Sequence, residues 1–86
     1  MVDKAPPTPG QFRAARAWSG LTRRHVADAI GASDYSVQSM EGLGSAAKYQ
    51  PSRGLIGRLH AFYIKHGFVF IGQGGIAKHD LTRSLS

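Results

Sequence analysis

The chain has 86 residues, 42% of them hydrophobic, which suits one small domain with a modest core. It contains no cysteine, so disulfide frameworks and thiolate metal sites are excluded. Eleven Lys and Arg against five Asp and Glu give a formal charge of +6 and a pI near 10.4. This surplus favours a polyanionic partner, most simply nucleic acid, over a merely soluble basic protein. The apolar runs are too short for a membrane-spanning helix, and the first ten residues lack the apolar stretch of a signal peptide.

The N-terminal part predicts a disordered arm over residues 1–7, which is rich in proline, followed by a helix. Thr8, the proline after it and Gln11 fit a helix start with a capping box. Apolar residues at helical spacing then continue the helix over 9–19, and Gly20 ends it.

The stretch from 21 to 41 carries the strongest evidence for a particular fold. Thr22 and Ser33 are N-cap candidates for helices over 23–30 and 34–41. Gly31 makes the corner between them because glycine reaches positive φ without steric cost. Ala27 must be small where the second helix crosses above it, and the apolar stripes are formed by Val26, Ala27, Ile30, Val37 and Met40. Two short capped helices joined around a glycine form a helix-turn-helix pattern.

The C-terminal half predicts one more helix, after which the spacing of apolar residues changes from that of a helix to that of β-strands. Ser52 caps a helix over 53–66, and Gly67 ends it. The core-facing residues of this helix are Leu55, Ile56, Leu59, Phe62 and Tyr63. The sequence FVFI-GQGG-IAKH then indicates a β-hairpin over 68–79, followed by a flexible tail over 80–86. The predicted fold is mainly α, a domain over 8–79 with about four helices and a C-terminal hairpin.

The stretch FRAARAWSGLTRRHVADAIGASDYSVQSMEGLG resembles the Cro/CI-type (XRE) family of helix-turn-helix DNA-binding regulators. The marks of this resemblance are Arg16, Leu21, Thr22, Ala27, Gly31, Ser33, Val37 and Glu41. The tail HGFVFIGQGGI resembles the end of short bacterial members. The resemblance implies a lambda-repressor-like fold in which the helix over 34–41 lies in the major groove of DNA. It also implies a structural bridge between Arg16 and Glu41.

The same resemblance assigns the exposed positions of the recognition helix, which are Asp34, Tyr35, Ser36, Gln38 and Ser39. Arg23 stands where relatives often have a glutamine that reaches phosphate or base. This sequence departs from the family in two ways: Asp34 brings a negative charge near phosphates, and the hairpin replaces a fifth helix of the larger repressors.

Each candidate DNA contact has a simpler alternative. Gln38 can pair with adenine N6 and N7, or be an ordinary exposed residue. Arg23 and Arg24 sit at a helix N-terminus, where the helix dipole prefers acidic residues. Their unfavourable position is easier to understand if phosphates lie opposite, so we favour phosphate contacts. Tyr35 can touch sugar or a thymine methyl, or be partly buried. Asp34 suits a helix-dipole partner better than a cytosine reader.

The remaining candidates lie at helix starts and in the loop before 53–66. Ser33 is a cap first, with phosphate contact as a second role. Lys48 and Arg53 are phosphate contacts by resemblance, or solvated surface.

Catalysis and metal binding have little support, so we expect no cofactor, no metal and no enzyme. His60 and His66 are six residues apart and point to different helix faces. The GQGG run lacks the Lys-Ser/Thr of a phosphate loop and does not open a helix.

Two functions follow as hypotheses. The first is a cytoplasmic, nucleoid-associated, sequence-specific regulator of transcription that binds double-stranded DNA as a homodimer, acting as repressor or activator. Phe68, Phe70 and Ile71 are the predicted dimer interface, because the apolar strand needs a partner. The second is a protein-interaction module of the same fold that binds RNA polymerase or acts like an antitoxin on a toxin.

Overall fold

The computed structural model describes residues 7–44, 51–72 and 74–78, which form four helices and a two-stranded antiparallel sheet. In chain order the elements are α1 (Pro9–Ser19), α2 (Arg23–Ile30), α3 (Asp34–Met40), α4 (Arg53–Lys65), β1 (Phe68–Ile71) and β2 (Gly75–Lys78). The predicted mainly helical fold with a C-terminal hairpin is confirmed. The helices expected over 34–41 and 53–66 each end one residue earlier, with Glu41 and His66 as C-caps.

Most of the predicted arm and all of the predicted tail lie outside the described residues. Pro7, counted in the arm, is the first described residue and is buried. None of the helices in the described ranges has the length and apolar character needed to span a bilayer.

Local sequence signals set the helix boundaries. Each helix begins at a hydroxyl residue whose side chain accepts a backbone N–H three positions later, and these caps are Thr8, Thr22, Ser33 and Ser52. α2 ends at Gly31, whose φ of 73° is left-handed, and the Ala32 N–H donates to the Ala27 carbonyl at 2.8 Å. This corner turns the chain directly into α3.

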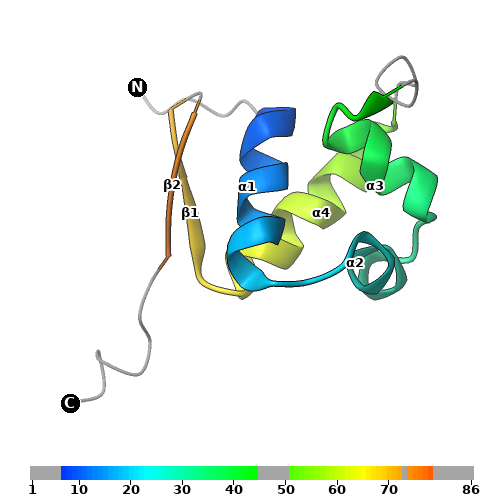
Figure 1. Ribbon diagram of the computed structural model, residues 1–86, viewed down its shortest axis with the longest axis horizontal. Helices are drawn as coiled ribbons and strands as arrows, with labels where there is room; N and C mark the ends of the chain where they lie inside the picture. The colour runs from blue at the N-terminus through cyan, green and yellow to red at the C-terminus, as the bar shows by residue number, and fades with distance from the viewer. Residues whose placement is uncertain (1–6, 45–50, 73, 79–86) are drawn as a thin grey trace.

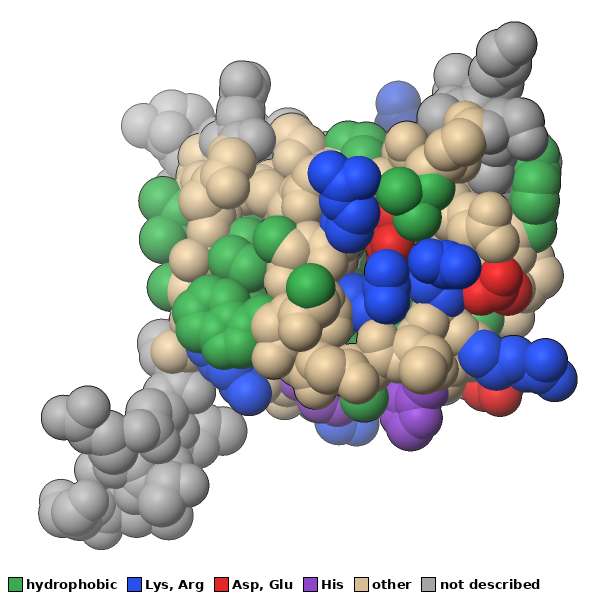
Figure 2. Space-filling view, in the orientation of Figure 1, with side chains coloured by type: hydrophobic (Ala, Val, Ile, Leu, Met, Phe, Trp, Pro, Cys, Tyr) green, Lys and Arg blue, Asp and Glu red, His purple; other side chains and the backbone are tan. Residues whose placement is uncertain are grey.

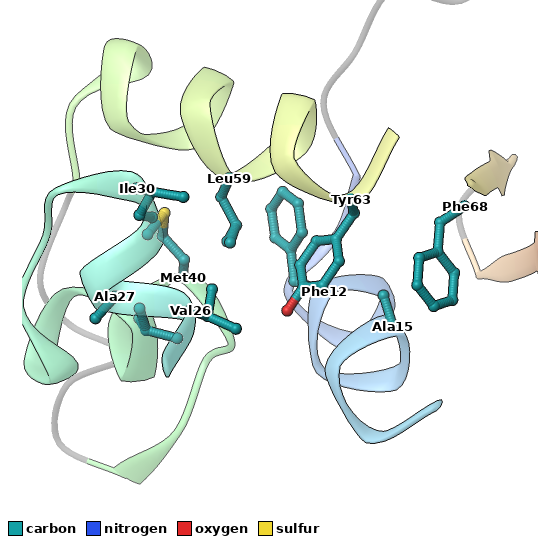
Figure 3. Close-up of a cluster of buried hydrophobic side chains, with 10 residues drawn as sticks. Phe12, Ala15, Val26, Ala27, Ile30, Met40, Leu59, Tyr63 and Phe68 are labelled. Carbon is teal, nitrogen blue, oxygen red and sulfur yellow. The ribbon is translucent and has the colours of Figure 1, made fainter. Parts of the chain in front are cut away.

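The core lies under α4 and has two parts (Figure 3). Leu59 points toward the apolar faces of α2 and α3, including Ile30 and Met40, while Tyr63 lies beside Phe12 of α1. The other three α4 residues expected in the core are only partly buried and pack at its edge: Leu55, Ile56 and Phe62. Ala27 is 2% exposed and belongs to the buried face of α2, together with Val26 and Ile30.

The hairpin lies on the side of α1 away from α2 and α3 (Figure 1). Its register pairs Phe68 with Lys78 and Ile71 with Gly75. Phe68 is 1% exposed, and its ring centroid lies 5.8 Å from that of Tyr63 and 5.6 Å from that of Trp18. The prediction of Phe68 as a dimer contact is therefore wrong, because its ring is already covered by the helices of its own chain.

A buried glutamine ties the hairpin to the start of α1. Gln11 is 1% exposed, and its side-chain Oε1 accepts the Thr8 N–H at 2.8 Å, which completes the predicted capping box. Its Nε2 donates to the Gly75 carbonyl at 2.8 Å and to the Gly72 carbonyl at 3.3 Å. The sequence predicts only the capping role. The second role anchors the hairpin turn.

Tyr63 buries a hydroxyl that has no hydrogen-bond partner among the described residues. Burial raises the pKa of this phenol above its ordinary value of 10.0. The folded protein then holds the proton more tightly than the unfolded chain, so stability is lost as pH rises above 10.

We therefore expect Tyr63→Phe to raise the free energy of unfolding by about 1 kcal/mol at neutral pH, because the unsatisfied hydroxyl is removed. Above pH 10 the gain over wild type should grow. Urea unfolding at pH 7 and pH 10.5 measures both, with the exposed Tyr35→Phe as control. A loss of stability in Tyr63→Phe would show that its hydroxyl is satisfied.

Candidate functional site

A buried ion pair holds the end of α3 against α1. Arg16 Nε donates to Glu41 Oε2 at 2.7 Å and Nη2 donates to Oε1 at 3.1 Å, which is the bridge that the family resemblance implies. The Glu41 side chain is fully buried, and that of Arg16 is 18% exposed. Arg16 Nη1 also donates to the Leu21 carbonyl at 3.2 Å. The hydrogen bond to Glu41 raises the pKa of the Arg16 guanidinium above its ordinary value, so Arg16 stays charged at any physiological pH.

Three polar side chains meet where α2 begins beside the start of α3. Asp34 Oδ2 accepts the Gln38 Nε2–H at 2.8 Å, one helical turn away, and Asp34 Oδ1 lies 3.5 Å from Arg23 Nε. The side chains of Arg23 and Asp34 are 37% and 44% exposed. We call these three residues the α2–α3 cluster. It brings together three of the residues predicted as DNA contacts.

The helix dipoles explain part of this arrangement. Arg23 and Arg24 open α2, which has no acidic residue in its first turn, so two cations face its positive end. Asp34 opens α3 and supplies the acid that the dipole there prefers. Asp34 therefore lies where a dipole partner was predicted, and it also offsets one of the two misplaced cations of α2.

Basic side chains dominate the surface around the cluster. Figure 2 shows Lys and Arg side chains gathered where α1, α2 and α3 meet, and hydrophobic side chains on the side of the hairpin.

The chain matches no protein-family model, no curated protein sequence and no solved structure. The functional interpretation therefore depends on the chemistry of this surface.

The other predicted contacts on α3 differ in availability. Tyr35 is 50% exposed, so its ring is partly covered by the chain and partly accessible to a ligand. The Ser33 hydroxyl accepts the Ser36 N–H at 3.1 Å and donates to the Ser36 Oγ at 3.0 Å. The predicted cap is confirmed, and both hydroxyls are engaged within the chain.

Ser39 is only 6% exposed, so its prediction as an exposed contact is wrong. It is buried together with Val37 and Met40, so burial on this seven-residue helix extends beyond the apolar stripe that these two residues form. Arg24 and Arg53 are exposed at the starts of α2 and α4. The remaining predicted contact, Lys48, lies outside the described residues.

The bond between Asp34 and Gln38 was not anticipated, although the sequence carries a signal for it. Residues four apart on a helix face each other, and an Asp–Gln pair at that spacing can form a hydrogen bond. Within the described ranges, no group of three or more His, Asp or Glu side chains is placed to hold a metal ion.

Proposed function

We propose that the protein is a sequence-specific, double-stranded DNA-binding regulator of the Cro/CI type, in which α2, the corner at Gly31 and α3 act as a helix-turn-helix. The observation that carries this proposal is the α2–α3 cluster, in which the amide of Gln38 and the guanidinium of Arg23 both contact Asp34 at the edge of a basic surface. The bridge from Arg16 to Glu41 supports it, because a reading helix needs a fixed orientation.

In the proposed complex α3 enters the major groove and Gln38 presents its amide to a base edge. Arg23, Arg24 and Arg53 approach phosphates and release condensed counterions, which gives a salt-dependent affinity. Phosphate contacts set the register, and contacts from α3 supply the sequence information.

The test of this function is selection of bound duplexes from a random pool at near-physiological salt. Retardation of any single DNA is not enough, since a protein of charge +6 binds duplexes unspecifically. Enrichment of a defined motif supports the proposal. An unchanged pool would reject sequence-specific binding.

On the selected duplex, Gln38→Ala and Arg23→Ala should fail in different ways. Gln38→Ala should lose roughly 1–3 kcal/mol of discrimination at one base pair. Arg23→Ala should weaken all duplexes alike and reduce the slope of log K against log salt by about one.

Binding isotherms at several salt concentrations separate the two effects. Arg58→Ala is the matched control for Arg23→Ala, because it removes the same charge from the groove between α2 and α4. Equal effects of the two arginine variants would reduce the role of Arg23 to net charge.

A homodimer remains part of the proposal. Ile71 at the end of β1 is 55% exposed, so this predicted contact is still available to a second copy. Phe70 is partly buried and its ring already packs on Phe12 and His60, so it can offer only an edge. A twofold dimer should select an inverted repeat whose half-sites are about 34 Å apart. Sedimentation of the protein with and without the selected duplex measures the stoichiometry.

The exposed Trp18 and Ile71 favour a second candidate, a protein-interaction module whose partner is a protein such as RNA polymerase or a toxin. Under this alternative Gln38→Ala and Arg23→Ala have little effect, and Trp18→Ala breaks the partner contact.

A further inference from the structure

One carboxylate contacts both side chains at the centre of the proposed interface. Asp34 accepts a hydrogen bond from Gln38 Nε2 at 2.8 Å and lies 3.5 Å from Arg23 Nε. Arg23 Nε is itself buried and has no hydrogen-bond partner among the described residues, so its contact with Asp34 is ionic and long. The two contacts of Asp34 therefore differ in kind: Gln38 is held by a short hydrogen bond, and Arg23 is held loosely.

The short hydrogen bond fixes which end of the Gln38 amide faces Asp34. An ionised carboxylate can only accept hydrogen bonds, so the NH2 group must face it and Oε1 must face elsewhere. A glutamine without such a neighbour can turn its amide by half a rotation, which exchanges donor and acceptor. Asp34 removes that freedom before any ligand arrives.

We propose that Asp34 is a positioning residue that fixes the donor and acceptor ends of the Gln38 amide, and thereby makes adenine the base that this position selects. This inference rests on the proposed function. With one N–H given to Asp34, the amide retains a second N–H and Oε1. These complement the N7 acceptor and the N6 donor of adenine. Guanine presents two acceptors in the same place, so one of them would face Oε1.

The loose contact with Arg23 has a separate consequence. The negative charge of Asp34 offsets that of Arg23 and lowers the attraction of this surface for phosphates in general. When a duplex docks, a phosphate oxygen can replace the 3.5 Å contact while Gln38 stays bonded. Asp34 thus weakens unspecific binding and leaves the reading of the base intact.

The test compares Asp34→Asn with Asp28→Asn. Both substitutions raise the net charge by one, but Asp28 is an exposed residue of α2 outside the cluster. Asparagine is nearly isosteric with aspartate and can either donate or accept, so it no longer fixes the amide of Gln38. Affinities are measured for the duplex selected by wild type, for its variants at the base pair lost in Gln38→Ala, and for an unrelated duplex.

Wild type and Asp28→Asn should prefer the A·T pair over G·C by roughly five- to hundred-fold at that position. Asp34→Asn should reduce this preference to within about two-fold and bind the unrelated duplex more tightly than Asp28→Asn does. Equal preferences in the two variants would overturn the inference and leave the proposed function standing. A wild-type protein that enriches no duplex would overturn both.

A second measurement needs no DNA and guards against a folding defect. In NMR spectra the two Nε2 protons of Gln38 should be well separated in wild type and Asp28→Asn, because one of them is hydrogen-bonded. In Asp34→Asn the separation should shrink while the backbone resonances of α4 stay in place. The same separation in all three proteins would refute the proposal that Asp34 fixes the Gln38 amide.

Discussion

Arg16→Met should lower the free energy of unfolding by about 3 kcal/mol, far more than the loss of a surface ion pair. The substitution leaves the Glu41 carboxylate fully buried without its cation. It also removes the donor to the Leu21 carbonyl, and with it the link from α1 to the connection before α2. Glu41→Leu should cost less, because Arg16 keeps an exposed edge through which water can reach it.

Urea unfolding of the two single variants and of Arg16→Met/Glu41→Leu completes a double-mutant cycle. Replacing both charges with apolar side chains should bring stability back to within about 1 kcal/mol of wild type, since no unpaired charge remains. Strictly additive losses would show that the two side chains do not interact. The double variant should still bind the selected duplex less tightly, because α3 is no longer held by hydrogen bonds of fixed direction.

Phe68→Ala should lower the free energy of unfolding by about 3–5 kcal/mol, as expected for an aromatic ring removed from a packed core. The ring lies against both Tyr63 and Trp18, so its loss opens a cavity between the hairpin, α1 and α4. Because Phe68 belongs to the core of its own chain, the loss should be the same at every protein concentration.

Trp18 is the only tryptophan of the chain and reports directly on this packing. Its fluorescence should shift in native Phe68→Ala. The control is Ile71→Ala on the same strand, which should change stability by less than about 0.5 kcal/mol because its side chain is exposed. A loss in Phe68→Ala that disappears at high protein concentration would restore the dimer interpretation of this residue.

Short-range rules account for most of what the sequence predicts correctly. A hydroxyl cap and a glycine stop act within a few residues, so helices 9–19 and 23–30 are predicted to the residue. The corner at Gly31 is predictable for the same reason. The bridge from Arg16 to Glu41 spans 25 residues and was reached only through the family resemblance.

The errors concern side chains whose environment is set by distant parts of the chain. The apolar strand shows that Phe68 needs a partner, but not that α1 and α4 provide it. Ser39 is predicted as an exposed position of α3, yet it is buried together with Val37 and Met40. Within the site, α3 places Asp34 and Gln38 together by helical spacing, whereas Arg23 joins them only through the packing of α2 on α3.

The hydrogen bonds from Gln11 to the hairpin affect the order in which the surface of α1 is covered during synthesis. Its carbonyl partners in the hairpin turn lie 60 to 64 residues further along the chain. While the ribosome is still producing α4, the amide of Gln11 and the adjoining side of Phe12 have no hairpin to cover them. Helices α1 to α3 can form as they emerge. The side of α1 that receives the hairpin, however, stays exposed to solvent until β2 leaves the exit tunnel. The side of α1 opposite the proposed reading surface is therefore the last to be covered.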